Sequence, residues 1–221
     1  MTKLISTKDL RLQFNVGGKT IEVLNGITFA AEPGEIVSVV GPSGSGKTSL
    51  MMILAGLEKA TSGEVSVNSQ NLLTMTEDQL AVFRRHSVGV IFQNFHLVPT
   101  MTALENVALP LEFSGHSDAL DQAADILSKV GLEDRLTSYP GQLSGGEQQR
   151  VGIARAMVAK PKILFADEPT GNLDQDTGQR VTDLLFSLCR DQGSAMMLIT
   201  HDPQLAKLAD RQIHMKNGQL S

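Results

Sequence analysis

The segment Gly41-Pro42-Ser43-Gly44-Ser45-Gly46-Lys47-Thr48 decides the fold of this 221-residue chain. It matches the pattern Gly-x-x-x-x-Gly-Lys-Ser/Thr, in which glycines allow backbone N–H groups to surround a phosphate closely. A β-branched run, Ile36 to Val40, precedes it, and an apolar stretch through Leu57 follows, as a buried strand and a helix would. A glycine- and serine-rich surface turn would not need these flanks, so the pattern predicts a phosphate-binding loop.

The residues of this loop are expected to divide the work of binding a triphosphate. Lys47 would reach the β- and γ-phosphates, and the Thr48 hydroxyl would ligate Mg²⁺. The positive end of the following helix would add to the attraction. The predicted nucleotide contacts are Gly41, Pro42, Ser43, Gly44, Ser45, Gly46, Lys47, Thr48 and Ser49.

Two consecutive carboxylates, Asp167 and Glu168, follow a second apolar run, Ile163 to Ala166. Ligands gather at the carboxyl edge of parallel strands, so this pair is expected near the phosphate loop. Asp167 would hold Mg²⁺, and Glu168 would act as general base toward the attacking water. The alternative is a pair of solvated acids at the start of a loop.

A histidine, His201, follows a third apolar run, Ala195 to Thr200. An imidazole at a strand end can donate a hydrogen bond to a γ-phosphate, although a lone histidine is more often a packing or surface residue. No metal-ligand spacing links the remaining histidines, which are His86, His96, His116 and His214.

A second glycine-rich segment, Leu143-Ser144-Gly145-Gly146-Glu147, precedes an apolar helical stretch. Serine at a helix N-cap followed by two glycines forms another nest of a size that suits phosphate. The alternative is a simple capped helix.

The order of elements predicts an α/β fold with a mixed sheet. Leu10, Leu12 and Phe14 alternate with polar residues, and Gly17-Gly18 separates them from the strand-like stretch Ile21 to Ala30, which favours N-terminal antiparallel strands. Later strands alternate with helices, as in a largely parallel core. We expect a single domain, residues 1–221, with a core of about 1–93 and 158–221 and a helical subdomain of about 94–157.

The chain resembles the ATP-binding subunits of ABC transporters over essentially its whole length. Leu143 to Glu147 matches the signature motif of that family, which is far more specific than a phosphate loop. Gln93 matches the Q-loop glutamine, Gly171-Asn172-Leu173-Asp174 the D-loop, and His201 the switch histidine. Phe14 stands where the family has an aromatic residue that stacks on adenine, although tyrosine is commoner there.

This resemblance implies a P-loop NTPase fold of the ABC ATPase type that binds ATP and Mg²⁺. Lys47, Gln93, Glu168 and His201 would serve catalysis, and Gln93 would also approach the metal. Two copies would form a head-to-tail homodimer that holds ATP between the phosphate loop of one subunit and the signature of the other. The interface residues would be Ser144, Gly145, Gly146 and Asp174.

The resemblance also implies an integral membrane permease as partner. No apolar stretch of this chain approaches the roughly 18 residues of a membrane-spanning helix. The subunit is therefore expected in the cytoplasm, attached to the inner face of the membrane through the permease. Residues 94–99 are the candidate docking segment, and the alternative is a packed turn that joins two elements.

Two further stretches resemble the lipoprotein-release, macrolide-export and cell-division group of ABC ATPases. They are Asp167 to Asp174 and Thr102 to Val107. Members of that group often transmit a mechanical stroke across the membrane. The permease would select the substrate, so this chain does not identify the cargo.

Three other classes of P-loop ATPase fit the sequence less well. A net charge of −5 argues against a duplex nucleic acid partner. DNA-associated relatives carry a long coiled coil or zinc modules, whereas this chain has no heptad run between Lys47 and Ser144 and a single cysteine, Cys189. Ribosome-associated relatives usually contain two cassettes. A small P-loop kinase would leave the signature motif unexplained.

Overall fold

The computed structural model describes residues 3–221, which form two compact units. The first unit runs up to Ser87 and resumes at Ala195–Ser221. The second unit is Val88–Ser194. Each unit has its own strands, helices and buried residues, and each carries part of the predicted site.

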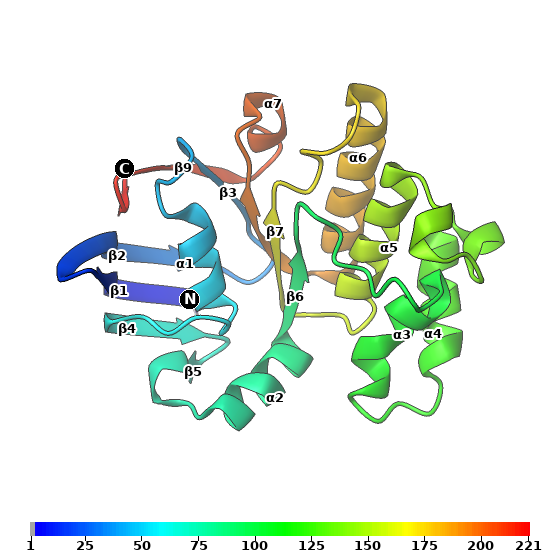
Figure 1. The fold of residues 1–221 in the computed structure, drawn as a ribbon, viewed down its shortest axis with the longest axis horizontal. Coiled ribbons are helices and arrows are strands. Elements are labelled where there is room, and N and C mark those ends of the chain that lie inside the picture. The colour runs from blue at the N-terminus through cyan, green and yellow to red at the C-terminus, as the bar shows by residue number, and fades with distance from the viewer. Residues whose placement is uncertain (1–2) are drawn as a thin grey trace. The chain divides into compact units, whose positions relative to one another are not determined.

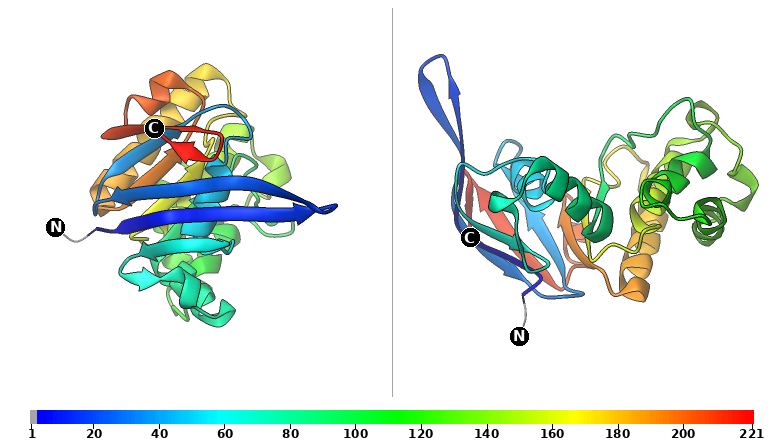
Figure 2. Two further views of the ribbon diagram at one scale, coloured as in Figure 1. Left: turned by 90° about the vertical axis from the view of Figure 1, so that its left-hand side faces the viewer. Right: turned by 90° about the horizontal axis from the view of Figure 1, so that it is seen from below.

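The N-terminal half of the first unit is an antiparallel sheet with the strand order β2-β1-β4-β5. Its strands are β1 (Ile5–Val16), β2 (Lys19–Ala31), β4 (Ser62–Val67) and β5 (Gln70–Asn71). The antiparallel start is confirmed, and β1 and β2 extend beyond the stretches Leu10 to Phe14 and Ile21 to Ala30 that the sequence indicated. Gly17 and Gly18 adopt φ of 57° and 76° at the turn, where most other residues would be strained. The end of this hairpin projects beyond the rest of the sheet (Figure 2).

The other strands of the first unit are in the order β10-β9-β3-β8. Their bounds are β3 (Ile36–Val40), β8 (Ala195–Ile199), β9 (Arg211–Lys216) and β10 (Gln219–Leu220). Strand β3 is parallel to both β8 and β9, and its apolar residues are buried as predicted. The sequence did not indicate the β9–β10 hairpin, because β9 is mainly polar and exposed.

Three α-helices belong to the first unit, α1 (Lys47–Leu54), α2 (Glu77–Ser87) and α7 (Pro203–Ala206), together with a 3₁₀ turn at Leu72–Thr74. The sequence reasoning missed α2, whose residues are mostly polar. Acidic residues in its first turn and basic residues in its last turn complement the helix dipole. This charge pattern indicates a helix, whereas the hydrophobic spacing did not.

The second unit combines two parallel strands with four helices (Figure 1). The strands are β6 (Val88–Ile91) and β7 (Ile163–Asp167). The helices are α3 (Ala103–Glu112), α4 (Ala119–Lys129), α5 (Gly145–Met157) and α6 (Gln175–Gln192), and 3₁₀ turns lie at Glu133–Arg135 and Pro140–Gln142. Helix α5 contacts α3, α4, α6 and β6, so it is the central helix of this unit.

A buried asparagine, Asn106, fixes the loop that leads into α3. It is fully buried, and its Oδ1 accepts a hydrogen bond of 2.7 Å from the Val98 N–H. Its Nδ2 donates to the backbone carbonyls of Val98, Met101 and Thr102 at 2.9–3.1 Å. Buried backbone N–H and carbonyl groups need hydrogen-bond partners, and this one side chain bonds four such groups of the loop.

We expect Asn106→Leu to lower the free energy of unfolding by about 2–4 kcal/mol, because the Val98 N–H and the Met101 carbonyl would lose their hydrogen-bond partner. Urea denaturation followed by circular dichroism would measure the loss. Thr102→Ala, which removes only the helix cap beside it, is the matched control and should cost about 1 kcal/mol. Equal losses for the two variants would contradict the role assigned to Asn106.

Candidate functional site

The phosphate loop lies between β3 and α1, as the sequence predicted. Two of its glycines are required by close packing as well as by backbone conformation. A Cβ on Gly41 would collide with the Met215 carbonyl oxygen, and one on Gly46, at φ 104°, would lie 2.8 Å from the Val23 carbonyl oxygen. The pattern of glycines therefore serves the shape of the loop itself.

The start of α1 is suited to an anion. In the described chain, no side chain caps this helix at Gly46, and its first turn contains no acidic residue. The Ser45 hydroxyl is buried and has no hydrogen-bond partner among residues 3–221. Helix N–H groups and an unpaired hydroxyl both favour a bound acceptor such as phosphate.

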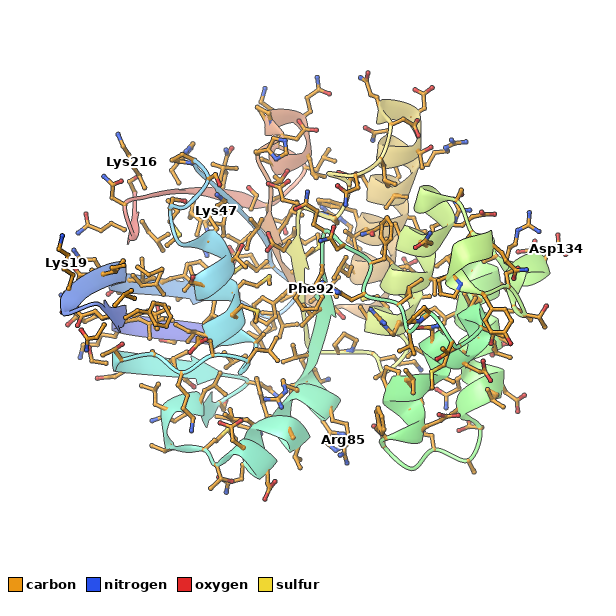
Figure 3. The ribbon with its side chains drawn as sticks, in the orientation of Figure 1. Lys19, Lys47, Arg85, Phe92, Asp134 and Lys216 are labelled. Atoms are coloured by element: carbon orange, nitrogen blue, oxygen red, sulfur yellow. The ribbon has the colours of Figure 1, made fainter. Side chains whose placement is uncertain are left out.

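The ammonium of Lys47 lies across this loop. Its Nζ donates to the carbonyl oxygens of Gly41 and Pro42, both at 2.9 Å. Figure 3 shows Lys47 beside the start of α1. A positive charge is thereby held over the backbone of this loop.

The turn between β9 and β10 supports the loop, a contribution that the sequence reasoning missed. The Gly218 N–H donates to the Ser45 carbonyl at 3.0 Å, and the Asn25 N–H donates to the Gly218 carbonyl at 2.8 Å. Asn217 and Gly218 both have positive φ, as in a type I′ hairpin turn. The Asn-Gly dipeptide was the signal in the sequence that could have revealed this turn.

His201 and the loop follow strands that lie side by side. The register of β3 and β8 pairs Val39 with Ile199, so Gly41 and His201 both come two residues after that pair, at the same edge of the sheet. The His201 side chain is exposed. Thr48 is exposed in the first turn of α1, so the structure places both predicted phosphate-site residues in the first unit.

Phe14 lies on β1 in the same unit. It pairs across the hairpin with Ile21, and the two side chains are 43% and 50% exposed. An apolar pair of this kind on an exposed hairpin offers a flat surface on which an aromatic ring can stack.

Gln93 and Glu168 meet at the carboxyl edge of the β6–β7 pair. The register aligns Ile91 with Ala166, so both residues follow two positions later. Gly171 lies between them. A Cβ added to this glycine would be 3.2 Å from the Gln93 Nε2 and 3.5 Å from the Glu168 Cβ. Gln93 and Glu168 are thus brought near each other in the second unit, a proximity that the sequence had not indicated.

Asn172 fixes the position of the Q-loop. Its Nδ2 donates to the Gln93 carbonyl at 2.9 Å and to Asn94 Oδ1 at 3.2 Å, while Gln93 Nε2 donates to Asn172 Oδ1 at 3.4 Å. The sequence analysis quoted Asn172 only as part of a motif and gave it no role. This side chain links the Q-loop to the D-loop directly.

The acidic pair has an unusual backbone. Asp167 ends β7, and Glu168 follows with φ of 48°, in the left-handed region that few residues other than glycine adopt. Both side chains are half-buried. Strained conformations of this kind are concentrated at functional sites, where the surrounding structure maintains them.

The signature segment forms the predicted cap of α5. The Ser144 side chain accepts from the Glu147 N–H at 3.3 Å, and Glu147 Oε2 accepts from the Ser144 N–H and hydroxyl, both at 2.8 Å. Gly146 is required by packing, because a Cβ there would collide with Thr177. Ser144 and Gly145 are exposed, so the surface of this nest can be reached from outside.

Asp174 caps α6. Its carboxylate accepts from the Thr177 N–H at 3.1 Å, and this hydrogen bond is the main cause that lowers the pKa of Asp174. The side chain is exposed, as a residue at a dimer interface would be in a single chain.

Arg155 holds the segment that follows Gln93, and the sequence analysis did not single it out. Its guanidinium donates to the carbonyls of His96 at 2.7 Å and Phe95 at 2.9 Å. Burial lowers the pKa of Arg155. The His96 ring also packs edge-on against Phe92, with centroids 5.1 Å apart. Residues 94–99 are therefore fastened to α5 in this structure, and Asn94, His96 and Pro99 are exposed on this segment.

The predicted site residues are divided between the two units. The phosphate loop, Phe14 and His201 belong to the first unit, whereas Gln93, the acidic pair, the signature and Asp174 belong to the second. Within residues 3–221, no three histidine, cysteine, aspartate or glutamate side chains are grouped as metal ligands. No helix in that part of the chain is both long and apolar enough to cross a membrane.

Comparison with known proteins identifies the family. The family model described as ABC transporter matches residues 24–171. The uncharacterised ABC transporter ATP-binding protein YbbA of Escherichia coli K12 is 47% identical over 219 residues, which cover 98% of this chain and 96% of YbbA. The macrolide export ATP-binding/permease protein MacB of Shigella flexneri is 45% identical over the whole chain, which spans only 34% of MacB.

A solved structure agrees with these relatives. The ATP-binding cassette MJ0796, described as a dimer in a post-hydrolysis state bound to ADP and Pi, has a TM-score of 0.91 and 37% identity. The match covers 98% of this chain and 96% of that one. The chain therefore belongs to the ABC transporter family and is an ATP-binding, ATP-hydrolysing subunit of that family.

Proposed function

We propose that two copies of this chain bind two ATP molecules between them and that hydrolysis of this ATP drives a separate membrane permease. The observation that carries the proposal is the start of α1. There, an uncapped helix, the Lys47 ammonium and a buried Ser45 hydroxyl without a hydrogen-bond partner in the described chain belong to the same loop and its helix. Together they favour a polyphosphate over any neutral ligand.

Lys47 would exchange its bonds to the Gly41 and Pro42 carbonyls for phosphate oxygens. Residues 41–49 would supply the backbone N–H groups around the phosphates. Phe14 would stack on adenine, for which the exposed Phe14–Ile21 pair provides a surface.

Mg²⁺ would neutralise charge on the β- and γ-phosphates. The oxygen donors available for it are the Thr48 hydroxyl, the Asp167 carboxylate and the Gln93 side-chain carbonyl. Hard oxygen ligands of this kind suit magnesium, which keeps several waters and needs few protein ligands.

Glu168 would accept the proton of the attacking water, and His201 would donate a hydrogen bond to the γ-phosphate. The aligned ends of β6 and β7 support this role for Glu168, since they place it beside Gln93. The constrained backbone at Glu168 would fix the direction of its carboxylate.

The exposed Ser144 and Gly145 of the signature support the dimer. Ser144, Gly145 and Gly146 form a second nest at a helix N-terminus, and a head-to-tail partner would present its γ-phosphate to that nest. Asp174 would lie at the same interface. The dimeric cassette MJ0796, 37% identical to this chain, supports this assembly.

The permease would dock near residues 94–99, and the subunit would lie at the cytoplasmic face of the membrane. The family supports this arrangement, because its relatives are described as transporter ATP-binding proteins. The relation to MacB and YbbA supports the branch that includes lipoprotein release and macrolide export. Cargo and direction would depend on the permease, and we expect no nucleic acid partner.

We expect Lys47→Ala to lower the ATPase rate by about 100-fold or more and to weaken ATP binding, because the phosphates lose their main positive charge. A coupled-enzyme assay and fluorescent-nucleotide titration would measure the two effects. Lys59→Ala, at an exposed position beyond α1, is the control and should leave both unchanged. Normal turnover by Lys47→Ala would exclude the proposed phosphate loop.

We expect Glu168→Gln to bind MgATP but to hydrolyse it at least about 100-fold more slowly, because the carboxamide cannot accept the proton. The variant should accumulate as a dimer in MgATP and remain monomeric in MgADP. Light scattering coupled to size-exclusion chromatography would show this. A variant that stays monomeric in MgATP while turning over normally would contradict the sandwich.

We expect Phe14→Ala to raise the KM for ATP about five- to tenfold with little change in kcat, because stacking stabilises the bound base and not the reaction. Phe14→Tyr should restore the wild-type KM. The stacking role would be wrong if both variants gave the wild-type KM.

A further inference from the structure

The signature serine is hydrogen-bonded to a carboxylate in this structure. The Ser144 hydroxyl donates to Glu147 Oε2 at 2.8 Å, and its oxygen accepts from the Glu147 N–H at 3.3 Å. Ser144 has one hydroxyl proton, and that proton is engaged. A phosphate oxygen is an acceptor, so Ser144 can bind it only by donating the same proton.

The carboxylate of Glu147 is held by three donors. Oε2 accepts from the Ser144 N–H and the Ser144 hydroxyl, both at 2.8 Å, and Oε1 accepts from Arg135 Nε at 3.1 Å. These bonds, led by the one from the Ser144 N–H, lower the pKa of Glu147 to about 2. Glu147 is therefore fully ionised at neutral pH and remains so when one donor leaves.

Arg135 is the one basic side chain that pairs with Glu147 in the described chain. It belongs to the 3₁₀ turn Glu133–Arg135, where its two neighbours are acidic and exposed. The Glu147 side chain is only 20% exposed, whereas Arg135 is 50% exposed. Solvent therefore screens the carboxylate poorly, and the guanidinium neutralises much of its charge.

We infer that Arg135 is a positioning residue of the ATP sandwich, which acts through Glu147 to let the Ser144 hydroxyl turn from that carboxylate to the γ-phosphate of the partner subunit's ATP. When the hydroxyl turns away, Glu147 keeps its bonds from the Ser144 N–H and from Arg135. Without Arg135, a single donor would remain. A negative charge would then face the incoming phosphate and compete for the serine proton.

This inference rests on the proposed dimer, but it predicts a property that the dimer alone does not require. The Ser144 hydroxyl would remain bonded to Glu147 until phosphate binds. Arg135 would lower the free energy needed to break that hydrogen bond. A glutamine at position 147 would retain the acceptor oxygen and remove the charge. The dimer dissociation constant should then no longer depend on Arg135.

The test is a double-mutant cycle in a Glu168→Gln background, with the dimer dissociation constant in MgATP measured by sedimentation equilibrium. We expect Arg135→Gln to raise this constant about tenfold, as the loss of one charge-assisted contact would. Glu147→Gln should leave it equal to or below the parent value. In the Glu147→Gln background, Arg135→Gln should change it by no more than about twofold.

Two controls separate this effect from a general change in charge or folding. Lys162→Gln removes a positive charge at an exposed position of the same unit and should leave the constant unchanged. Arg135→Lys keeps the charge and should recover most of the affinity. Urea unfolding of each variant would show whether Arg135→Gln acts through stability.

A second measurement uses protein that retains Glu168 and can hydrolyse ATP. The ATPase rate of Arg135→Gln should be low at dilute protein and should reach the wild-type rate when the protein concentration is raised. An equal effect of Arg135→Gln in the two backgrounds, or no effect in either, would overturn the inference and leave the dimer intact. A Glu168→Gln parent that never dimerises in MgATP would overturn the dimer and the inference together.

Discussion

The structure depends on helix α1, which begins at a glycine loop without a side-chain acceptor. Backbone N–H groups at the first turn of a helix need partners, and three helices of the second unit obtain them from Thr102, Ser144 and Asp174. Helix α1 begins at a glycine instead, in a loop whose backbone conformation excludes side chains at two positions. The fold places β3, the β9–β10 turn and Lys47 around this point, so the start of α1 is built to suit an anion.

In the second unit, backbone N–H groups at the start of the signature helix are bonded by side chains. Its signature helix is capped twice over, by a serine and by a glutamate that a nearby arginine neutralises. In the dimer proposed above, the hydrogen bond between Ser144 and Glu147 would be exchanged for one to phosphate. One helix N-terminus would then bind the ATP of its own subunit, and the other would bind the ATP of a partner.

The sequence predicted the parts of this arrangement that depend on local pattern. Strands β3 and β7, the loop between β3 and α1 and the Ser144 cap are confirmed as local structures, because each has a short, self-sufficient signature in the sequence. Helix α2 and the β9–β10 hairpin were missed because their residues are mainly polar, so hydrophobic spacing gave no signal. The contacts of Asn172 and Arg155 join segments about sixty residues or more apart, and such pairings follow from the tertiary fold and not from any local rule.

The turn at residues 94–99 has a mechanical consequence. Arg155 fastens its first part to α5 through two carbonyls, and Asn106 fastens Val98 to α3 through both backbone groups. A loop tied at both ends cannot absorb a displacement by bending, because every bond that would have to stretch leads into a helix. A force applied to this turn would therefore displace α3 and α5 together. The signature residues would move as well, because they lie at the N-terminus of α5.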